Sequence, residues 1–172
     1  MLLCSSRDRT WSLHKLHLEE LNGKLNVHGS MLGRTDKKTA VHTRLIWSCS
    51  WSNDSKYFAT GSRDKKVVIW GKRDDSSWGQ QGDVLNLADS VTAVSFATKK
   101  LEEGYVVAVG LENGAVYIFV WNNSWREITS FDSNSNGHHS TVTKLSFQPN
   151  VADYVVASCS SDNSVRITKV KI

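Results

Sequence analysis

The chain has 172 residues, of which 40% are hydrophobic, and this is enough for a sizeable core and excludes wholesale disorder. Its formal net charge of +4 permits an acidic protein or a phosphate backbone as partner but requires neither. No apolar run is long enough to predict a signal peptide or a membrane span, so we expect an intracellular protein.

The three cysteines, Cys4, Cys49 and Cys159, lie far apart along the chain. No CxxC motif occurs, and no Cys/His pair has the spacing of zinc ligands. We therefore expect neither a disulfide framework nor a metal site, and no cofactor.

One pattern recurs along the chain. It begins as LLCSSRDRTWSLH at 2–14 and returns as FATGSRDKKVVIW at 58–70, VAVGLENGAVYIF at 107–119 and VASCSSDNSVRIT at 156–168. Each copy is a short apolar run, a polar turn and an alternating strand. The residues at the equivalent turn position, 56, 49 and 49 residues apart, are Asp8, Asp64, Asn113 and Asp162.

Further strands complete each unit. An alternating strand precedes three copies, at 46–51, 91–96 and 142–147, and a weaker strand follows two of them, at 82–88 and 125–131. Four antiparallel strands at this period are typical of a propeller blade. The sequence therefore predicts an all-β fold of about a dozen strands with almost no helix.

The unit resembles the WD-repeat family, in which a His precedes the first strand and a Trp closes the third. His42 stands four residues before Ile46 and nine before Trp51, which is the family's spacing, and Gly137–His138 stands before Val142 in the same way. The resemblance implies a buried chain in which Asp accepts from His, His meets a hydroxyl, and the hydroxyl meets the indole N–H. Each of these polar groups needs a partner when it is buried between strands.

The resemblance assigns these roles unevenly among the blades. The blade at 42–88 has the full set, His42, Thr60, Asp64 and Trp70. The last blade has Thr168 in place of Trp and otherwise matches, with His138, Ser158 and Asp162. The middle blade has lost the polar set and relies on apolar packing, with Leu87, Val109, Asn113 and Phe119.

We divide the chain into four parts on this basis. They are the tail of a partial blade at 1–31, a WD blade with the full network at 32–88, a degenerate blade at 89–131, and a last blade without its outer strand at 132–172. Propellers need about four to eight blades to close. We therefore expect a WD-repeat β-propeller in the form of an open arc of about three and a half blades, and we expect the chain to be a fragment.

A narrower resemblance rests on three longer segments, SSRDRTWSL at 5–13, VHTRLIWSCSWSNDSKYFATGSRDKKVVIWG at 41–71 and YVVAVGLENGAVYIF at 105–119. Together with the closing SCSSDNSVRITKV they are similar to the C-terminal end of the second-subunit family of the Elongator complex. This implies a non-catalytic scaffold that supports tRNA wobble-uridine modification, with other Elongator subunits as partners. It also implies a cytoplasmic location, with the nucleus as a second one. A WD adaptor of an unrelated complex stays open as the alternative.

A His and an Asp beside a hydroxyl also invite interpretation as a hydrolase. These residues recur with the blade period, however, and the hydroxyl falls on a central strand rather than on an exposed elbow. No GxSxG, HExxH or phosphate-binding loop occurs. We therefore expect no catalytic residue, no small-molecule substrate and no enzyme.

Basic residues gather in the turns and connections that open on one face of the first two blades. They are Arg7, Arg9, Lys37, Lys38, Arg63, Lys65 and Lys66. The other two blades offer Glu112, Asn113 and Asn163 there. Such a cluster suits an acidic partner helix or RNA phosphates, while a solvated rim with local ion pairs is the competing interpretation. No aromatic residues interleave for base stacking, which argues against direct recognition of single-stranded RNA.

Overall fold

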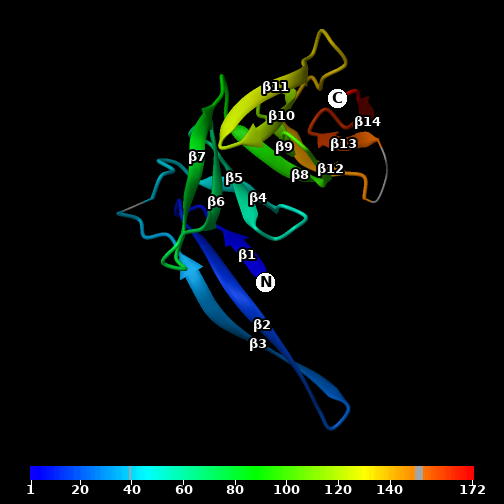
Figure 1. Cartoon of the computed structure of the whole chain (residues 1–172). Helices are drawn as coiled ribbons and strands as arrows, with labels where there is room; N and C mark the ends of the chain where they lie inside the picture. Colours follow the sequence, from blue (N-terminus) through cyan, green and yellow to red (C-terminus); the bar gives the residue numbers. More distant parts are fainter. Residues whose placement is uncertain (39, 150–152) are drawn as a thin grey trace.

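A computed structural model describes residues 1–38, 40–149 and 153–172. The described residues form fourteen strands and no helix, and every pair of neighbouring strands is antiparallel. The predicted all-β class is therefore confirmed. The strands make four sheets that follow one another along the chain (Figure 1). No helix long and apolar enough to cross a membrane occurs in the described part of the chain.

The first sheet has the order β1-β2-β3, with β1 at Leu2–Ser5, β2 at Trp11–Leu21 and β3 at Lys24–Arg34. β2 and β3 form a hairpin closed by Asn22 and Gly23, whose φ angles of 55° and 72° are those of a two-residue type I′ turn. The far part of this hairpin projects away from the rest of the molecule (Figure 1). β3 continues to Arg34, past the blade boundary expected at residue 31.

The second and third sheets each have four strands in chain order, as predicted for complete blades. The second contains β4 at Ile46–Trp51, β5 at Tyr57–Ser62, β6 at Lys66–Lys72 and β7 at Trp78–Asn86. The third contains β8 at Val91–Leu101, β9 at Gly104–Leu111, β10 at Val116–Asn122 and β11 at Ser124–Phe131. β8 is longer than the predicted strand at 91–96, and β7 begins before the predicted one at 82–88.

The last sheet has the order β12-β13-β14, with β12 at Val142–Phe147, β13 at Tyr154–Ser160 and β14 at Val165–Val170. The first strands of the second and last sheets coincide with the predicted strands at 46–51 and 142–147. The remaining blade boundaries, at 88/89 and 131/132, fall between strands and stay predictions.

The core lies between successive sheets rather than within one layer. Trp11 and Leu13 of the first sheet pack against Phe58 and Trp70 of the second. A second buried cluster joins the second sheet to the third, and a third joins the third sheet to the last. Because each sheet buries its apolar faces against its neighbours, the chain forms the predicted open arc of propeller blades.

The innermost strands of the arc are linked by hydroxyl groups. The Oγ atoms of Ser48 and Ser50 on β4 accept hydrogen bonds from the backbone N–H groups of Val94 and Phe96 on β8, both at 3.1 Å. The Thr92 hydroxyl in turn donates to the Val142 carbonyl oxygen at 2.6 Å. The bonded N–H and C=O groups belong to β8 and β12, which are edge strands of their sheets. Each hydroxyl therefore satisfies a backbone group at a sheet edge and ties two neighbouring blades together.

Candidate functional site

The polar turns at Asp8, Asp64, Asn113 and Asp162 repeat one local geometry. The first joins β1 to β2, and the others join the second and third strands of their sheets. The residue after the turn Asp or Asn has a positive φ in every sheet, at Arg9, Lys65, Gly114 and Asn163. The Asp or Asn oxygen accepts a hydrogen bond from the backbone N–H two residues later, as Asp64 does from Lys66 at 3.1 Å. Asp and Asn favour such turns because their short side chains reach this N–H. The repeat in sequence is therefore a repeat of one turn conformation.

In the second sheet the Asp64 side chain of this turn is the last acceptor in a buried series of hydrogen bonds. Asp64 Oδ2 lies 3.1 Å from His42 Nδ1, His42 Nε2 lies 2.8 Å from Thr60 Oγ1, and the Trp70 indole N–H donates to Thr60 Oγ1 at 2.8 Å. Because Asp64 accepts from Nδ1–H, a neutral His42 has Nε2 free to accept from the Thr60 hydroxyl. The structure thus brings together all four residues of the full set, in the order that the WD-repeat resemblance implies.

The pKa of Asp64 in this hydrogen-bonded series depends on burial and on its hydrogen bonds. The side chains of His42 and Asp64 are only 1% and 3% exposed. Burial raises the pKa of Asp64, but the hydrogen bonds from His42 and from the backbone N–H of Thr43 outweigh it. The pKa of Asp64 therefore lies below its ordinary value, and this carboxylate is ionised at neutral pH.

The last sheet keeps part of the arrangement. His138 Nδ1 lies 3.0 Å from Asp162 Oδ2, and His138 Nε2 lies 2.7 Å from Ser158 Oγ. Thr168 occupies the position that Trp70 has in the second sheet, so the hydrogen-bonded series ends at the Ser158 hydroxyl. The Ser164 hydroxyl, which donates to Asp162 at 2.6 Å, and the backbone N–H of His139 hold the pKa of Asp162 well below its usual range.

The third sheet replaces the polar chain with hydrophobic packing. Val109 and Phe119 are buried in the cluster between the second and third sheets, and Leu87 packs against it. Phe119 makes an edge contact with Trp125 at a ring-centroid distance of 5.8 Å. Asn113 keeps only the turn, where its side chain accepts from the backbone N–H of Ala115 at 3.1 Å.

The geometry of the buried chain does not suit catalysis. Thr60 has no exposed surface, and its oxygen already contacts His42 and the Trp70 N–H. A nucleophile must reach a substrate, and this hydroxyl is fully buried. Its role is to satisfy polar groups between strands.

The basic residues predicted as a partner face are mostly exposed, and the structure brings some of them together. Arg63 and Lys65 line a cavity of about 390 Å³ at the turn above the buried chain, together with Thr43, Arg44, Asp64 and Ser90. Lys65 is anchored there, because its Nζ donates to the Ala88 carbonyl oxygen at 2.8 Å. The sequence pattern does not single out Arg44, although it lies in the connection that enters the same blade.

The remaining basic residues are arranged more loosely. Lys37 Nζ lies 3.8 Å from Asp8 Oδ2, a local ion pair between exposed groups. The turn that bears Arg7 and Arg9 is tied to the second sheet, since the Ser6 carbonyl accepts from the N–H of Ile46 at 3.2 Å. Lys38 is exposed and Lys66 half-buried. Neither lines the cavity, although the backbone N–H of Lys66 donates to Asp64 Oδ1 there.

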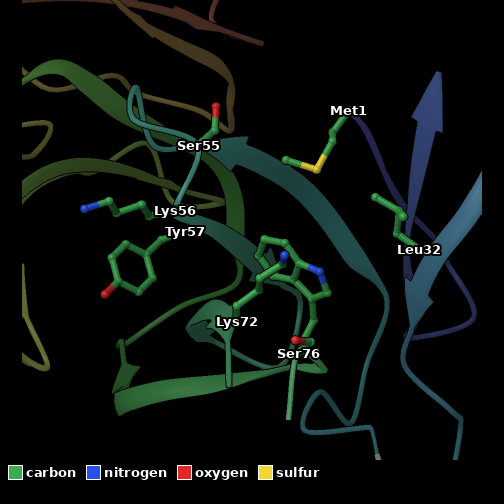
Figure 2. Close-up of a pocket in the computed structure, with 8 residues that line it drawn as sticks. Met1, Leu32, Ser55, Lys56, Tyr57, Lys72 and Ser76 are labelled. Carbon is green, nitrogen blue, oxygen red and sulfur yellow. The ribbon is translucent and has the colours of Figure 1, made fainter. Parts of the chain in front are cut away.

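A second cavity, of about 490 Å³, lies between the first and second sheets. Figure 2 shows Met1 and Leu32 on one side of it and Ser55, Lys56 and Tyr57 on the other. Lys72, Ser76 and Trp78 complete its lining. These side chains combine two cations with aromatic and aliphatic surface and include no carboxylate or imidazole, so the lining has no acid–base pair for catalysis.

Comparison with known proteins agrees with this structure. The model of the WD domain, G-beta repeat, matches residues 35–71 and 125–168. These ranges contain both His-Asp chains. With the four-stranded sheets and their repeated turns, they show that the chain belongs to the WD-repeat family of β-propeller proteins.

Curated relatives are more specific. The chain is 36% identical to Elongator complex protein 2 of Drosophila melanogaster over 99% of its length and 38% identical to that of Homo sapiens over 98%. It is 43% identical to that of Mus musculus over 77% of its length. The chain spans 22% of the fly protein and 23% of the human one, so it is similar to about a fifth of each.

Proposed function

We propose that the chain is part of a non-catalytic scaffold subunit that holds an Elongator assembly together. The observation that carries the proposal is the similarity to proteins named Elongator complex protein 2 over nearly the whole chain. In such a subunit the reaction, tRNA wobble-uridine modification, takes place on another subunit. This chain then contributes surface, without a cofactor or a small-molecule substrate, in the cytoplasm and in the nucleus.

The buried hydrogen bonds between His, Asp and hydroxyl groups support this role because they make the blades rigid. A scaffold must present its surface in one conformation, since each side chain that becomes ordered on binding weakens the complex. The turn above Asp64 is held by the hydrogen bonds of that carboxylate to His42, Thr43 and Lys66. Its neighbours Arg63 and Lys65 are therefore displayed on a fixed backbone.

The cavity above the second blade is the best candidate for a docking point. Arg44, Arg63 and Lys65 place three cations around it, while its one carboxylate, Asp64, already accepts from His42 and two backbone N–H groups. An acidic side chain of a partner subunit would find unneutralised positive charge there. RNA phosphates carry the same charge, but no aromatic residue lines this cavity to stack a base.

The test is charge reversal of the face in the assembled complex. Arg7, Arg9, Arg63, Lys65 and Lys66 are replaced by Glu, and recovery of the other subunits is measured beside tRNA retention at two salt concentrations. We expect subunit recovery to fall, wild-type recovery to decrease with salt, and tRNA modification to drop as a consequence. Each surface substitution should change stability by only about 0.5 kcal/mol.

Lys56→Glu with Lys72→Glu, at the cavity of Figure 2, provides the matched control and should leave assembly intact. Normal assembly with weakened tRNA retention would favour direct RNA binding instead. Normal assembly and normal tRNA retention would show that the basic face is a solvated rim.

A further inference from the structure

The projecting β2–β3 hairpin is amphipathic although little of it is packed. The register pairs Leu16 with Gly29, Leu18 with Val27 and Glu20 with Leu25. Directly opposed residues point to the same side of a sheet, and the direction alternates along each strand. Leu16, Leu18, Leu25 and Val27 therefore share one side, with Glu20 at its end opposite Leu25. Leu18, Leu25 and Val27 are 65%, 66% and 55% exposed. Such an apolar row on a projection is the mark of an interaction surface.

The outer edge of this hairpin is open. Within the described residues β3 pairs only with β2. The two-residue turn makes Leu21 and Lys24 a hydrogen-bonded pair, and bonded pairs then alternate with non-bonded ones. Leu25, Val27 and Gly29 belong to the non-bonded pairs, so their N–H and C=O groups point away from β2. An incoming strand would meet this row of donors and acceptors.

The open edge is also basic. β3 contains Lys24, His28 and Arg34 but no Asp or Glu. Lys24 and His28 lie on the side opposite the apolar row, and Glu19 of β2 is their diagonal neighbour toward the hairpin's interior. Nothing acidic among the described residues lies beyond them at the free edge. Antiparallel pairing of two β3 strands about Gly29 would place Lys24 opposite Arg34 twice, so that register disfavours a second copy of this chain.

We propose that β3 accepts an extended segment of another protein as an added strand, and that this segment alternates apolar and acidic residues. Its apolar side chains continue the row of Leu25 and Val27, and its carboxylates lie beside Lys24 and His28. Backbone hydrogen bonds supply affinity in this mode, and the alternate side chains supply specificity. The surface is separate from the basic face, because the hairpin turn and Arg9 lie at opposite ends of β2, roughly 35 Å apart.

The probe is a fluorescent peptide of alternating Glu and Val, with a peptide of alternating Lys and Val as its charge control. Binding to the full chain is followed by fluorescence polarisation. We expect the acidic peptide to bind and the basic peptide to fail. Hydrogen exchange of the Leu25, Val27 and Gly29 amides should slow when the acidic peptide is bound, because added-strand pairing protects the outward N–H groups.

Two proline variants distinguish the edges of the hairpin. Val27→Pro removes an outward N–H of β3, and Leu18→Pro makes the same change on the residue directly opposite, whose N–H points to the other edge. We expect Val27→Pro to lower the affinity for the acidic peptide about tenfold or more. Leu18→Pro should leave that affinity close to the value for the unmodified chain. Lys24→Glu, which leaves the backbone unchanged, should lower the affinity for the acidic peptide and raise the affinity for the basic one.

The proposal is overturned if the basic peptide binds as well as the acidic one, or if the unmodified chain binds neither. It is also overturned if Leu18→Pro loses as much affinity as Val27→Pro while Lys24→Glu has no effect. Self-association of the chain that Val27→Pro abolishes would identify a second copy as the occupant of this edge and would overturn the proposed partner.

Discussion

Replacement of Asp64 by Ala removes the acceptor at the end of the buried chain in the second blade. Asp64 accepts from His42 Nδ1, from the N–H of Thr43 and from the N–H of Lys66. Thr43 is exposed, so water can replace the carboxylate at its N–H, but His42 is 2% exposed and cannot be hydrated in place. The variant therefore leaves one buried donor without a partner.

The magnitude follows from that single donor. A buried polar group left unpaired costs about 1–3 kcal/mol, and the lost turn hydrogen bond to Lys66 adds about 1 kcal/mol or less. We expect the free energy of unfolding to fall by roughly 2–3 kcal/mol, seen in urea denaturation as a lower midpoint with an unchanged slope. Asp75→Ala is the matched control, because Asp75 also accepts in a turn, from Ser77 at 2.8 Å, but is exposed. Its cost should stay within about 0.5 kcal/mol.

The same residue should make stability depend on pH. The pKa of Asp64 is lowered in the folded state, so its contribution is fully present above the unfolded pKa near 4 and is lost as pH falls through the lower folded value. The difference in unfolding free energy between the unmodified chain and Asp64→Ala should therefore shrink on acidification below about pH 4. If Asp64→Ala and Asp75→Ala have equal midpoints at neutral pH, the buried chain does not stabilise the blade.

Two further predictions concern packing. Phe119→Trp should not raise the urea midpoint, because Val109 lies where the second blade has Thr60 and offers the indole N–H no hydroxyl. An increase of about 1 kcal/mol in the free energy of unfolding would show that another acceptor is within reach. The chain alone should self-associate with rising concentration in light scattering, because β14 leaves Ile167 75% exposed beside an open edge, and Ile167→Lys should reduce this association. A monodisperse monomer at all concentrations would contradict the second prediction.

Much of the fold follows from local pattern. The turns at Asp8, Asp64, Asn113 and Asp162 were predictable because an Asx turn needs only the Asp or Asn and the next two residues. The position of Asn22–Gly23 between alternating runs also signals a hairpin, and this signal marks the β2–β3 turn that the repeat pattern alone does not reveal. Strand ends were less predictable, as the extension of β8 to Leu101 shows, because they depend on what each end packs against.

The contacts between blades were not predictable in this way. Ser48 and Ser50 bridge to β8, and the Tyr105 hydroxyl donates to Asp54 Oδ2 at 2.7 Å from the next sheet. Arg44 meets Arg63 and Lys65 at a cavity that Ser90, in the connection to the third sheet, also lines. Each of these contacts joins different strands or connections, and the repeat spacing does not say which side chains will meet there.

By itself, the sequence determines the blade unit: four short strands, a turn on Asp or Asn, and a set of polar residues whose spacing lets them meet within one sheet. These features depend on backbone preferences and on pairing between strands that are neighbours in the chain. Only the tertiary structure decides that the β2–β3 hairpin projects with an open basic edge, and which cations gather above the second blade. These depend on how whole sheets stack, and stacking is decided by the combined burial of many side chains rather than by any one segment.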